Sequence, residues 1–534
     1  MRKKDLNYSF SKVPSIKKPR SRFNRSHNHI TAFDSGYLVP VYVDEVLPGD
    51  TFKMKLSSFS RLATPAVPVM DNVYMDFHFF YVPNRLLWEH WEQMNGQQDK
   101  PGAKIDYLTP IFDAGSKGVA VGSLFDYMGV PPKVPHLQFS SLFARAYNKI
   151  WNDWYRDENL QDPVPEHMDD KTIELGDTTS KDYVLLRRNK KRDYFTGALP
   201  WPQKGPSAAL NFASNSDISS EQVFASYSSK DVSVSKDRLV FDSLGYGPTY
   251  NGQHQSFMPL LSLDHTTGRP IKLDLKNSNI SLPPVSINQL RQAVQLQRLF
   301  ELDARGGTRY IEMIQTHFGV TVPDFRLQRS EYLGGGKSII DFNAIPQTSA
   351  TSGTSPQGNL AAYATQFAKN IGFTRSFDEH GVILCLASVR VDQKYQYGLP
   401  RMYSRRTRLD YYMPVNANLG EQAIMAKELY ATGDKAKDEL VFGYQERWSE
   451  YRYNPNRVSG KLRSVADAPL DVWHLGQKFT EPPKLNAEFI KSDPPLKRML
   501  AVQNEPQIVS DLYFQVDCTR VMPVYSVPGS FGRF

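Results

Sequence analysis

The chain has 534 residues, a formal net charge of +8 and two cysteines, Cys385 and Cys518. This length suits one large domain with insertions or two or three ordinary domains, and two cysteines so far apart exclude a disulfide framework and a cysteine metal site. The longest apolar run, VILCLASV at residues 382–389, is too short to span a bilayer. No apolar segment of signal-peptide length follows the basic amino terminus, so we expect synthesis in a cytoplasm and no membrane insertion.

The excess positive charge lies in residues 1–25. This segment holds one acid, Asp5, and nine cations, whereas the rest of the chain sums to zero; the cations are Arg2, Lys3, Lys4, Lys12, Lys17, Lys18, Arg20, Arg22 and Arg25. A basic segment with few apolar residues cannot bury enough surface to offset its ordering entropy, so we expect residues 1–30 to be a mobile, phosphate-binding arm. Tyr8, Phe10 and Phe23 lie among the cations, which favours a single-stranded polyanion that can stack on them. A solvated tail without a partner is the alternative.

The segment VDEVLPGDTFKMK, residues 43–55, contains three acids that raise the question of a catalytic cluster. Adjacent strand residues point to opposite faces, so Asp44 and Glu45 are not a catalytic pair. Asp50 follows a Pro-Gly turn signal, and the alternation after it predicts a half-buried strand. We therefore interpret all three acids as turn and strand-edge groups.

Strands dominate the two ends of the chain. NVYMDFHFFYV predicts a strand with one mixed face, formed by Tyr74, Asp76, His78 and Phe80, and one apolar face, formed by Val73, Met75, Phe77, Phe79 and Tyr81. Near the carboxyl end a second set alternates in the same way: Leu512, Phe514, Val516 and Cys518. If the first and last strands pair, the sheet closes across the whole sequence, as an antiparallel sandwich of the Greek-key type allows.

Helices are predicted in the middle of the chain. An apolar stripe recurs at spacings of three and four: Phe143, Tyr147, Ile150, Trp151 and Trp154. Ser286 and Gln289 form a capping box ahead of a helix that ends at Gly306, and a shorter helix runs from Tyr310 to near Gly319. Residues 206–285 are rich in Ser, Asn and Asp, which predicts a large polar surface excursion.

Catalytic and metal-binding patterns are weak. GGGKS at residues 334–338 resembles the end of a phosphate-binding loop, but Glu331 stands where that motif needs glycine. HNH at residues 27–29 lacks the further ligands of a defined metal site. We expect no catalytic residue, metal or cofactor. The alternatives are a nucleic-acid enzyme with a basic tail, or a non-viral nucleic-acid-binding or carbohydrate-binding β-sandwich.

Long segments in order resemble the major capsid proteins of gokushoviruses, the single-stranded DNA bacteriophages of the microvirus group (Microviridae, Gokushovirinae). The segments are GYLVPVYVDEVLPGDTF (36–52), RLATPAVPVMDN (61–72), FFYVPNRLLWEHWEQMNG (79–96), RAYNKIWNDWYRDENLQDPV (145–164), DYFTGALPWPQKG (193–205), INQLRQAVQLQRLFELDARGGTRYIEMIQTHFGV (287–320), RLQRSEYLGGG (326–336), FGYQERWSEYRYNPNRVSGK (442–461) and MPVYSVPG (522–529).

The resemblance implies a mainly β chain with an eight-stranded viral jelly roll, an antiparallel β-sandwich with long helical and loop insertions. Residues 31–205 would form its first part, residues 206–285 a variable protrusion, and residues 286–534 the remainder with a carboxyl-terminal tail. It implies a structural protein, not an enzyme, of which about 60 copies form a T=1 icosahedral capsid around a circular single-stranded DNA genome. This virion would assemble in the cytoplasm of a bacterial host, and its further partners would be a DNA pilot protein, an internal scaffolding protein and a host-cell surface receptor.

Overall fold

The computed structural model describes residues 19–98, 100–176, 181–205, 287–306, 310–319, 328–353 and 356–525. The chain divides into two compact units, one of residues 1–204 with 301–534 and one of residues 205–300. The predicted protrusion at residues 206–285, the capping residue Ser286 and the first 18 residues of the arm lie outside the described residues. The first unit contains the main sheet and all other described residues except residue 205 and residues 287–300.

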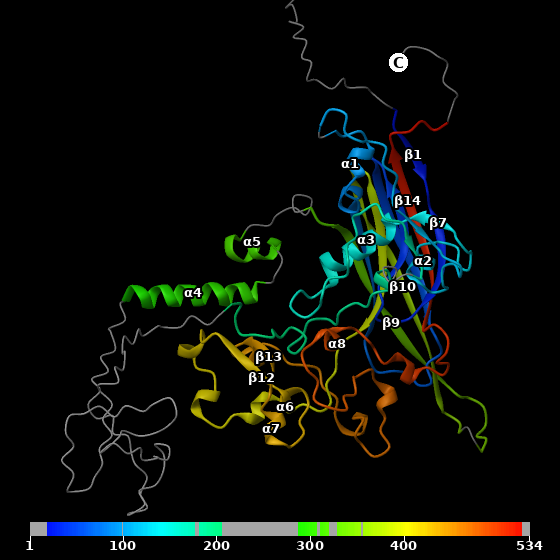
Figure 1. The fold of residues 1–534 in the computed structure, drawn as a ribbon. Coiled ribbons are helices and arrows are strands. Elements are labelled where there is room, and N and C mark those ends of the chain that lie inside the picture. The colour runs from blue at the N-terminus through cyan, green and yellow to red at the C-terminus, as the bar shows by residue number, and fades with distance from the viewer. Residues whose placement is uncertain are drawn as a thin grey trace, which may run out of the picture. The chain divides into compact units, whose positions relative to one another are not determined.

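The first unit is built around a nine-stranded antiparallel sheet (Figure 1). Its strands, in chain order, are β1 (Ser21–Asn24), β2 (His27–Phe33), β3 (Val39–Val46), β4 (Thr51–Leu62), β5 (Val73–Pro83), β9 (Glu331–Pro346), β10 (Leu360–Ser376), β11 (Gly381–Val391) and β14 (Ile508–Arg520). In space they follow the order β1-β14-β4-β10-β9-β5-β11-β3, with β2 also paired to β14. This curled antiparallel sheet confirms the prediction of a mainly β jelly-roll sandwich with insertions.

One face of every long strand points into a single core. In β4 the buried residues alternate with exposed ones, as the sequence predicts, and the predicted apolar sets of β5 and β14 are all buried. These side chains form one cluster with residues of β3, β10 and β11. At about 25 cal/mol per Å² of apolar surface removed from water, this shared core is the main stabilising contribution to the sheet.

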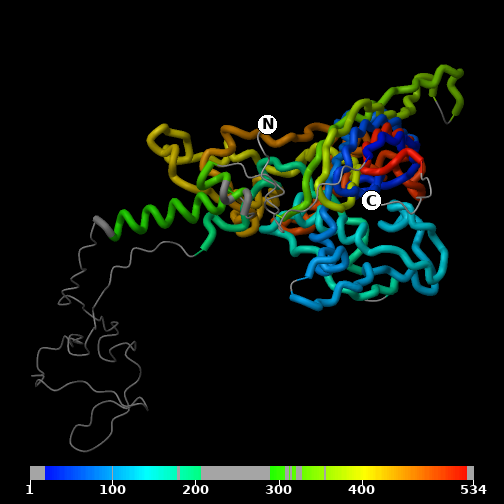
Figure 2. The backbone as a smooth tube through the Cα atoms, turned by 90° about the horizontal axis from the view of Figure 1, so that it is seen from above, coloured from blue at the N-terminus to red at the C-terminus, as the bar shows by residue number. Residues whose placement is uncertain are grey.

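The first and last strands lie side by side, which confirms the predicted closure across the sequence. β14 pairs with β4 along nearly its whole length and with β1 and β2 on its other edge. Figure 2, viewed from above, shows the blue amino-terminal strands against the red carboxyl-terminal strand. Residues 21–24 and 27–33 are therefore strands, which differs from the mobile arm expected to extend to residue 30.

The two halves of the sheet differ in what covers their outer face. The outer sides of β5, β11 and β3 pack against residues 84–186, so β11 is buried on both faces. This double burial explains the continuous apolar run at residues 382–389, since a strand covered on both sides does not alternate. On β14, β4 and β10 the outward residues are largely exposed to solvent.

The covering insertion holds the predicted aromatic helix. It is α3 (Leu142–Ile150), which continues as one π-helical turn, Trp151–Tyr155. Tyr147 and Ile150 are fully buried, and Tyr147 Oη donates a hydrogen bond of 2.8 Å to the carbonyl of Leu38. The insertion also contains α1 (Trp91–Met94), α2 (Leu124–Tyr127) and a small sheet of β6 (Ile111–Asp113), β7 (Gln138–Ser140) and β8 (Ile173–Glu174).

The remaining elements lie between residues 287 and 500. The two predicted helices are confirmed as α4 (Ile287–Arg305) and α5 (Tyr310–Phe318). A separate core holds a hairpin of β12 (Glu421–Met425) and β13 (Val441–Glu446) with α6 (Ala426–Leu429) and α8 (Ala487–Ile490). The short helix α7 (Lys435–Asp438) has no buried residue. Of the helices in the described ranges, none has the length and apolarity needed to cross a membrane.

Candidate functional site

The acids of residues 43–55 hold the edge strand β3 to the terminal strands. Arg25 donates two hydrogen bonds to the carboxylate of Asp44, at 2.8 and 2.6 Å, and Tyr42 Oη donates to it at 2.7 Å. Burial raises the pKa of Tyr42, and the charge of Asp44 raises it further, so the phenol stays a donor. Glu45 is exposed on the other side of the strand. The two acids face different surroundings, as the strand alternation predicts.

Asp50 closes the turn between β3 and β4. Its carboxylate is fully buried and accepts the backbone N–H of Leu47 at 3.0 Å and Nε of Arg520 at 2.9 Å. A second nitrogen of Arg520 donates to the carbonyl of Glu45 at 2.7 Å. Asp44 and Asp50 thus have cationic protein partners, and Glu45 is exposed. These surroundings support the interpretation of the three acids as turn and strand-edge groups.

The nine cations proposed to bind nucleic acid fall into two groups. Six of them lie outside the described residues: Arg2, Lys3, Lys4, Lys12, Lys17 and Lys18. The other three contact protein acceptors: Arg20 donates to the carbonyl of Gly49, Arg22 lies 2.5 Å from Asp517, and Arg25 binds Asp44. The pairing of the first strand with the last, which puts Ser21 opposite Arg520, brings Arg22 and Arg25 to acids and Arg20 to a backbone carbonyl, which their place in the basic segment could not reveal.

The two histidines of the HNH segment have structural contacts. The ring of His27 stacks on those of Tyr42 and Phe514, with centroid distances of 5.6 and 5.5 Å, and these two rings also contact each other at 5.0 Å. Nδ1 of His29 lies 2.8 Å from the carbonyl oxygen of Val41. In the part of the chain that the structure describes, no group of three or more His, Cys, Asp or Glu side chains could hold a metal ion.

The glycine run at residues 334–336 lies within strand β9. Gly334, Gly335 and Gly336 are opposite Phe79, His78 and Phe77 of β5. A side chain on Gly335 would meet the carbonyl oxygen of Phe77, so the close approach of two strands explains this glycine. The segment is extended and does not open a helix, so it lacks the geometry of a phosphate-binding loop.

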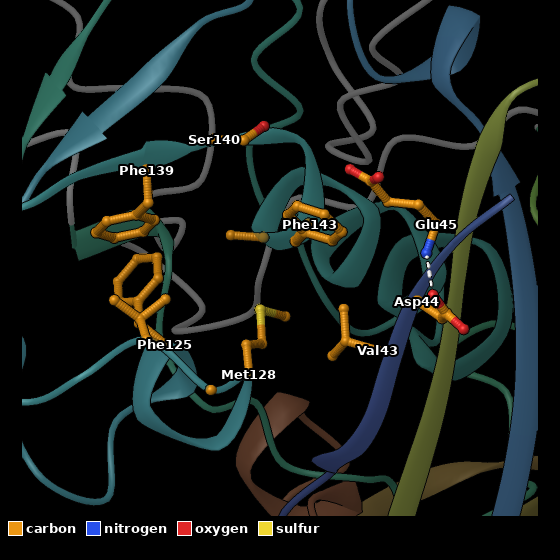
Figure 3. Close-up of a pocket in the computed structure, with 11 residues that line it drawn as sticks. Val43, Asp44, Glu45, Phe125, Met128, Phe139, Ser140 and Phe143 are labelled. Carbon is orange, nitrogen blue, oxygen red and sulfur yellow. Dashed lines mark hydrogen bonds between the residues drawn. The ribbon is translucent and has the colours of Figure 1, made fainter. Parts of the chain in front are cut away.

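A pocket of about 320 Å³ lies beside β3, between α2, β7 and the start of α3 (Figure 3). The side chains labelled in Figure 3 include four apolar ones directed into the space: Val43, Phe125, Met128 and Phe143. Asp44 and Glu45 lie at one side, where Asp44 accepts the backbone N–H of Glu45 at 2.8 Å. The lining includes neither histidine nor cysteine, and it provides no pair of groups placed for acid–base chemistry.

A buried charge network fixes the helical insertion to the sheet. The carboxylate of Asp76, on the outer side of β5, binds Arg188 and lies 2.7 Å from Nε of Arg390. Burial raises the pKa of Asp76, but the two guanidinium groups outweigh it and hold the pKa below its usual value. Next to it, burial and the positive Arg188 lower the pKa of His78 to about 4, while its Nδ1 lies 2.7 Å from Tyr155 Oη. A neutral His78 and an ionised Asp76 are packing partners here, and neither lines the pocket beside β3.

A curled antiparallel jelly roll extended by insertions is an architecture that viral shell proteins use. The sequence pattern of the phage capsid protein (F protein) family matches residues 11–530. Three similar proteins, each a capsid protein VP1, come from Bdellovibrio phage phiMH2K, Chlamydia phage 1 and Spiroplasma virus 4. They are 43%, 41% and 36% identical to this chain, cover 99%, 97% and 98% of it, and are themselves covered to 98%, 97% and 97%.

The chain belongs to the phage capsid protein (F protein) family, and its role is structural. This confirms the resemblance to gokushovirus capsid proteins and the expectation that the chain is not an enzyme. It also decides against the alternatives of a nucleic-acid enzyme and of a carbohydrate-binding sandwich. A capsid protein assembles with copies of itself into a shell, and its location is the virion.

Proposed function

We propose that the chain forms a closed T=1 icosahedral shell of about 60 copies around a circular single-stranded DNA genome. The observation that carries this proposal is the match along nearly the whole chain to capsid proteins of three small phages or viruses. The jelly-roll sheet supplies the rigid body of each subunit, and the insertions between its strands supply surfaces that differ from one side of the subunit to another. Assembly takes place in the cytoplasm of a bacterial host.

The basic arm is proposed to contact the packaged DNA. Its support is the concentration of the entire net charge of +8 in residues 1–25. The six cations before residue 19 carry this role, since Arg20, Arg22 and Arg25 are engaged by protein groups. Phosphate contacts of this kind depend on charge and not on base sequence, which suits a shell that encloses one genome of any composition.

Residues 206–285 are proposed to form a protrusion that contacts the host-cell surface receptor. The support is their polar composition, which is rich in Ser, Asn and Asp. Surface insertions can vary without disturbing the strands that carry them. A DNA pilot protein and an internal scaffolding protein complete the proposed set of partners.

The proposal is tested by electron microscopy of the full chain expressed in a bacterium and separated by sedimentation. The expected result is round particles of uniform size, whose symmetry average shows 60 equivalent subunits. Particles of mixed size, open sheets or tubes, or particles that never contain nuclease-protected single-stranded DNA in infected cells, would contradict the closed-shell proposal.

A further inference from the structure

Strands β9 and β10 extend beyond the sheet as a two-stranded ribbon. β5 accompanies β9 only as far as Ile340, and β4 accompanies β10 only from Thr365 onward. Beyond these points residues 341–346 pair with residues 360–365 and with no other described strand. Figures 1 and 2 both show this yellow-green hairpin projecting away from the other strands. Its inner face is packed at Phe342, Ala362 and Ala364, whereas its outer face is open, and a two-stranded ribbon has little stability of its own in water, so this one gains from a partner.

The outer face of the ribbon continues into the uncovered half of the sheet. Six of the large apolar side chains on this face are between 43% and 59% exposed: Phe59, Ile339, Ile345, Tyr363, Phe367 and Val509. We call these six residues the outer apolar patch. Its centre is the directly opposed pair Phe59 and Phe367, on β4 and β10.

The strand register makes the outer apolar patch continuous. Val509 is opposite Arg61, the outward residue that follows Phe59 on β4. Ser338 Oγ donates to the carbonyl of Phe367 at 2.9 Å, which places Ile339 beside β10. Tyr363 and Ile345 are opposite Asn343 and Ala361 and so share the ribbon's outer face.

The size of the patch matches one half of a protein–protein interface. Six half-exposed side chains present roughly 500 Å² of apolar surface if each has about 150–200 Å² in total. A stable interface buries about 800 Å² per partner, of which about 65% is apolar at its centre, or roughly 500 Å². Solvent-exposed patches of this extent on a subunit mark interaction sites.

The charges around the patch favour protein over nucleic acid as the partner. Arg61 and Lys369 lie over the rings of Phe59 and Phe367, at 5.7 and 5.1 Å from the centroids. On the same face Asp511 is opposite Phe59 and Asp341 is opposite Thr365, and these carboxylates would repel phosphates. Aromatic and arginine side chains inside a rim of both charge signs are typical of a protein interface.

We infer that the outer apolar patch and the ribbon of residues 341–364 form a contact with a second copy of this chain in the shell. The inference rests on the capsid role of the family and adds the surface through which copies meet. A neighbouring subunit would cover Phe59 and Phe367 at the centre and support the ribbon along its outer face. The outer face of the ribbon would then be packed against protein, which an isolated hairpin lacks.

The test is a charge placed at the centre of the patch in the full chain. Both Phe59→Glu and Phe367→Glu lie on the solvent side of the isolated subunit, so the double variant should stay folded, with the wild-type circular dichroism and a thermal unfolding midpoint lowered only slightly by the two opposed carboxylates. Its yield of particles on a sedimentation gradient should fall at least tenfold, because two carboxylates would be desolvated at the contact. The matched control is Leu108→Glu with Val415→Glu, at two strongly exposed positions away from the patch, which should assemble at the wild-type yield.

Hydrogen–deuterium exchange tests the same contact in the wild-type protein, so its result does not depend on whether a variant folds. Amides of residues 341–346 and 360–365 should exchange at least tenfold more slowly in particles than in free subunits. Equal exchange rates, or wild-type yield from the double variant, would overturn the inference. Normal particles of the double variant with less packaged DNA would overturn it in favour of a DNA contact, and equal loss in the control would show a general charge effect. Failure of the wild-type chain to form particles would instead count against the capsid role itself.

Discussion

Nε of Arg520, at the end of the last strand, lies 2.9 Å from Oδ2 of Asp50, in the turn before β4. Asp50 is fully buried, so its charge is removed from water and depends on this partner and on the N–H of Leu47. The pair ties the carboxyl-terminal strand to the turn that starts the sheet. It belongs to the class of buried ion pairs whose disruption leaves an uncompensated charge.

Arg520→Met should therefore lower the free energy of unfolding by about 3–5 kcal/mol, because Asp50 would remain buried without its cation. The matched change is Asp517→Asn, which breaks the pair with Arg22, a side chain that is 66% exposed. That exposed pair should contribute less than about 1 kcal/mol. Urea denaturation of the subunits measures both, and losses of equal size would show that burial does not distinguish the two pairs.

The neutral state of His78 predicts a loss of stability in acid. Its pKa of about 4 in the folded chain lies below the ordinary value of 6.5, so below pH 6.5 the unfolded chain takes up a proton that the folded chain refuses. Stability should fall as the pH drops from 6.5 to 4, by about 3 kcal/mol from this residue at most. His78→Gln should flatten this part of the stability curve.

The control for His78 is His136→Gln, which removes a side chain that is 64% exposed and should leave the slope unchanged. Asp76 does not interfere in this window, because its pKa is held below the usual value of 3.8 and its contribution is lost only at lower pH. Denaturation curves of the three proteins at several pH values from 7 to 4 give the result. An unchanged slope in His78→Gln would mean that another group causes the acid sensitivity.

Gly372 allows β10 to approach β4 after a bulge between Ala368 and Ile371. A Cβ atom there would meet the carbonyl oxygen of Met54 and lie 3.1 Å from Cα of Lys55. Gly372→Ala should therefore destabilise the subunit by about 2 kcal/mol through overpacking. Gly353→Ala is the matched control, because nothing lies within 4 Å of its added Cβ. Thermal unfolding midpoints of the two variants measure the difference. Equal midpoints would show that β10 and β4 can move apart without loss of stability.

The arm should bind single-stranded DNA with a steep salt dependence, of about −0.7 in log–log slope for each phosphate neutralised. Changing Arg2, Lys3, Lys4, Lys12, Lys17 and Lys18 to Gln should remove most of that slope. Changing Arg20, Arg22 and Arg25 to Gln should instead lower the stability of the sheet and leave most of the slope intact. Fluorescence titration with an oligonucleotide at several salt concentrations separates the two sets. A slope that survives in the six-residue variant would exclude the arm as the DNA-binding site.

Replacement of residues 206–285 by a short Gly/Ser linker tests the proposed protrusion. Particles should still form, because residues 21–83, 331–391 and 508–520 supply the nine strands of the main sheet, and attachment to host cells should fall by more than tenfold. Adsorption of purified particles to cells measures attachment, with electron microscopy as the check on assembly. Folded subunits that fail to assemble would make this region an assembly element instead.

Sequence patterns predicted the elements in which one strand face is buried. The alternation of Phe52, Met54 and Leu56, and the matching sets in β5 and β14, were sufficient because a period of two follows directly from one-sided burial. The long pair β9 and β10 was not predicted, because its glycines and small polar residues resemble a loop when the neighbouring strand is unknown. The signal that could have found it is the alternation of Tyr363 and Phe367 with alanines.

The contacts between charged side chains could not be predicted from the spacing of residues in the sequence. Arg188 and Arg390 bind Asp76 from 112 and 314 residues away, so no local motif links them. The same holds for Arg25, which is read as part of a basic arm until the pairing of β1 and β2 with β14 brings it to Asp44. Local sequence determines which groups are charged, whereas the closure of the sheet determines their partners.

The pairing of β4 with β14 also sets an order of events during synthesis. β4 is complete when residue 62 leaves the ribosome, yet its partner strand begins at Ile508. At about 5–20 residues per second, roughly 20 to 90 s separate the two strands. Until β14 is made, one edge of β4 and one side of the core stay uncovered. The nascent chain therefore has no complete sheet with which another copy could form a contact. Shell growth must therefore draw on released, completed chains, and truncated translation products should be unable to enter the shell.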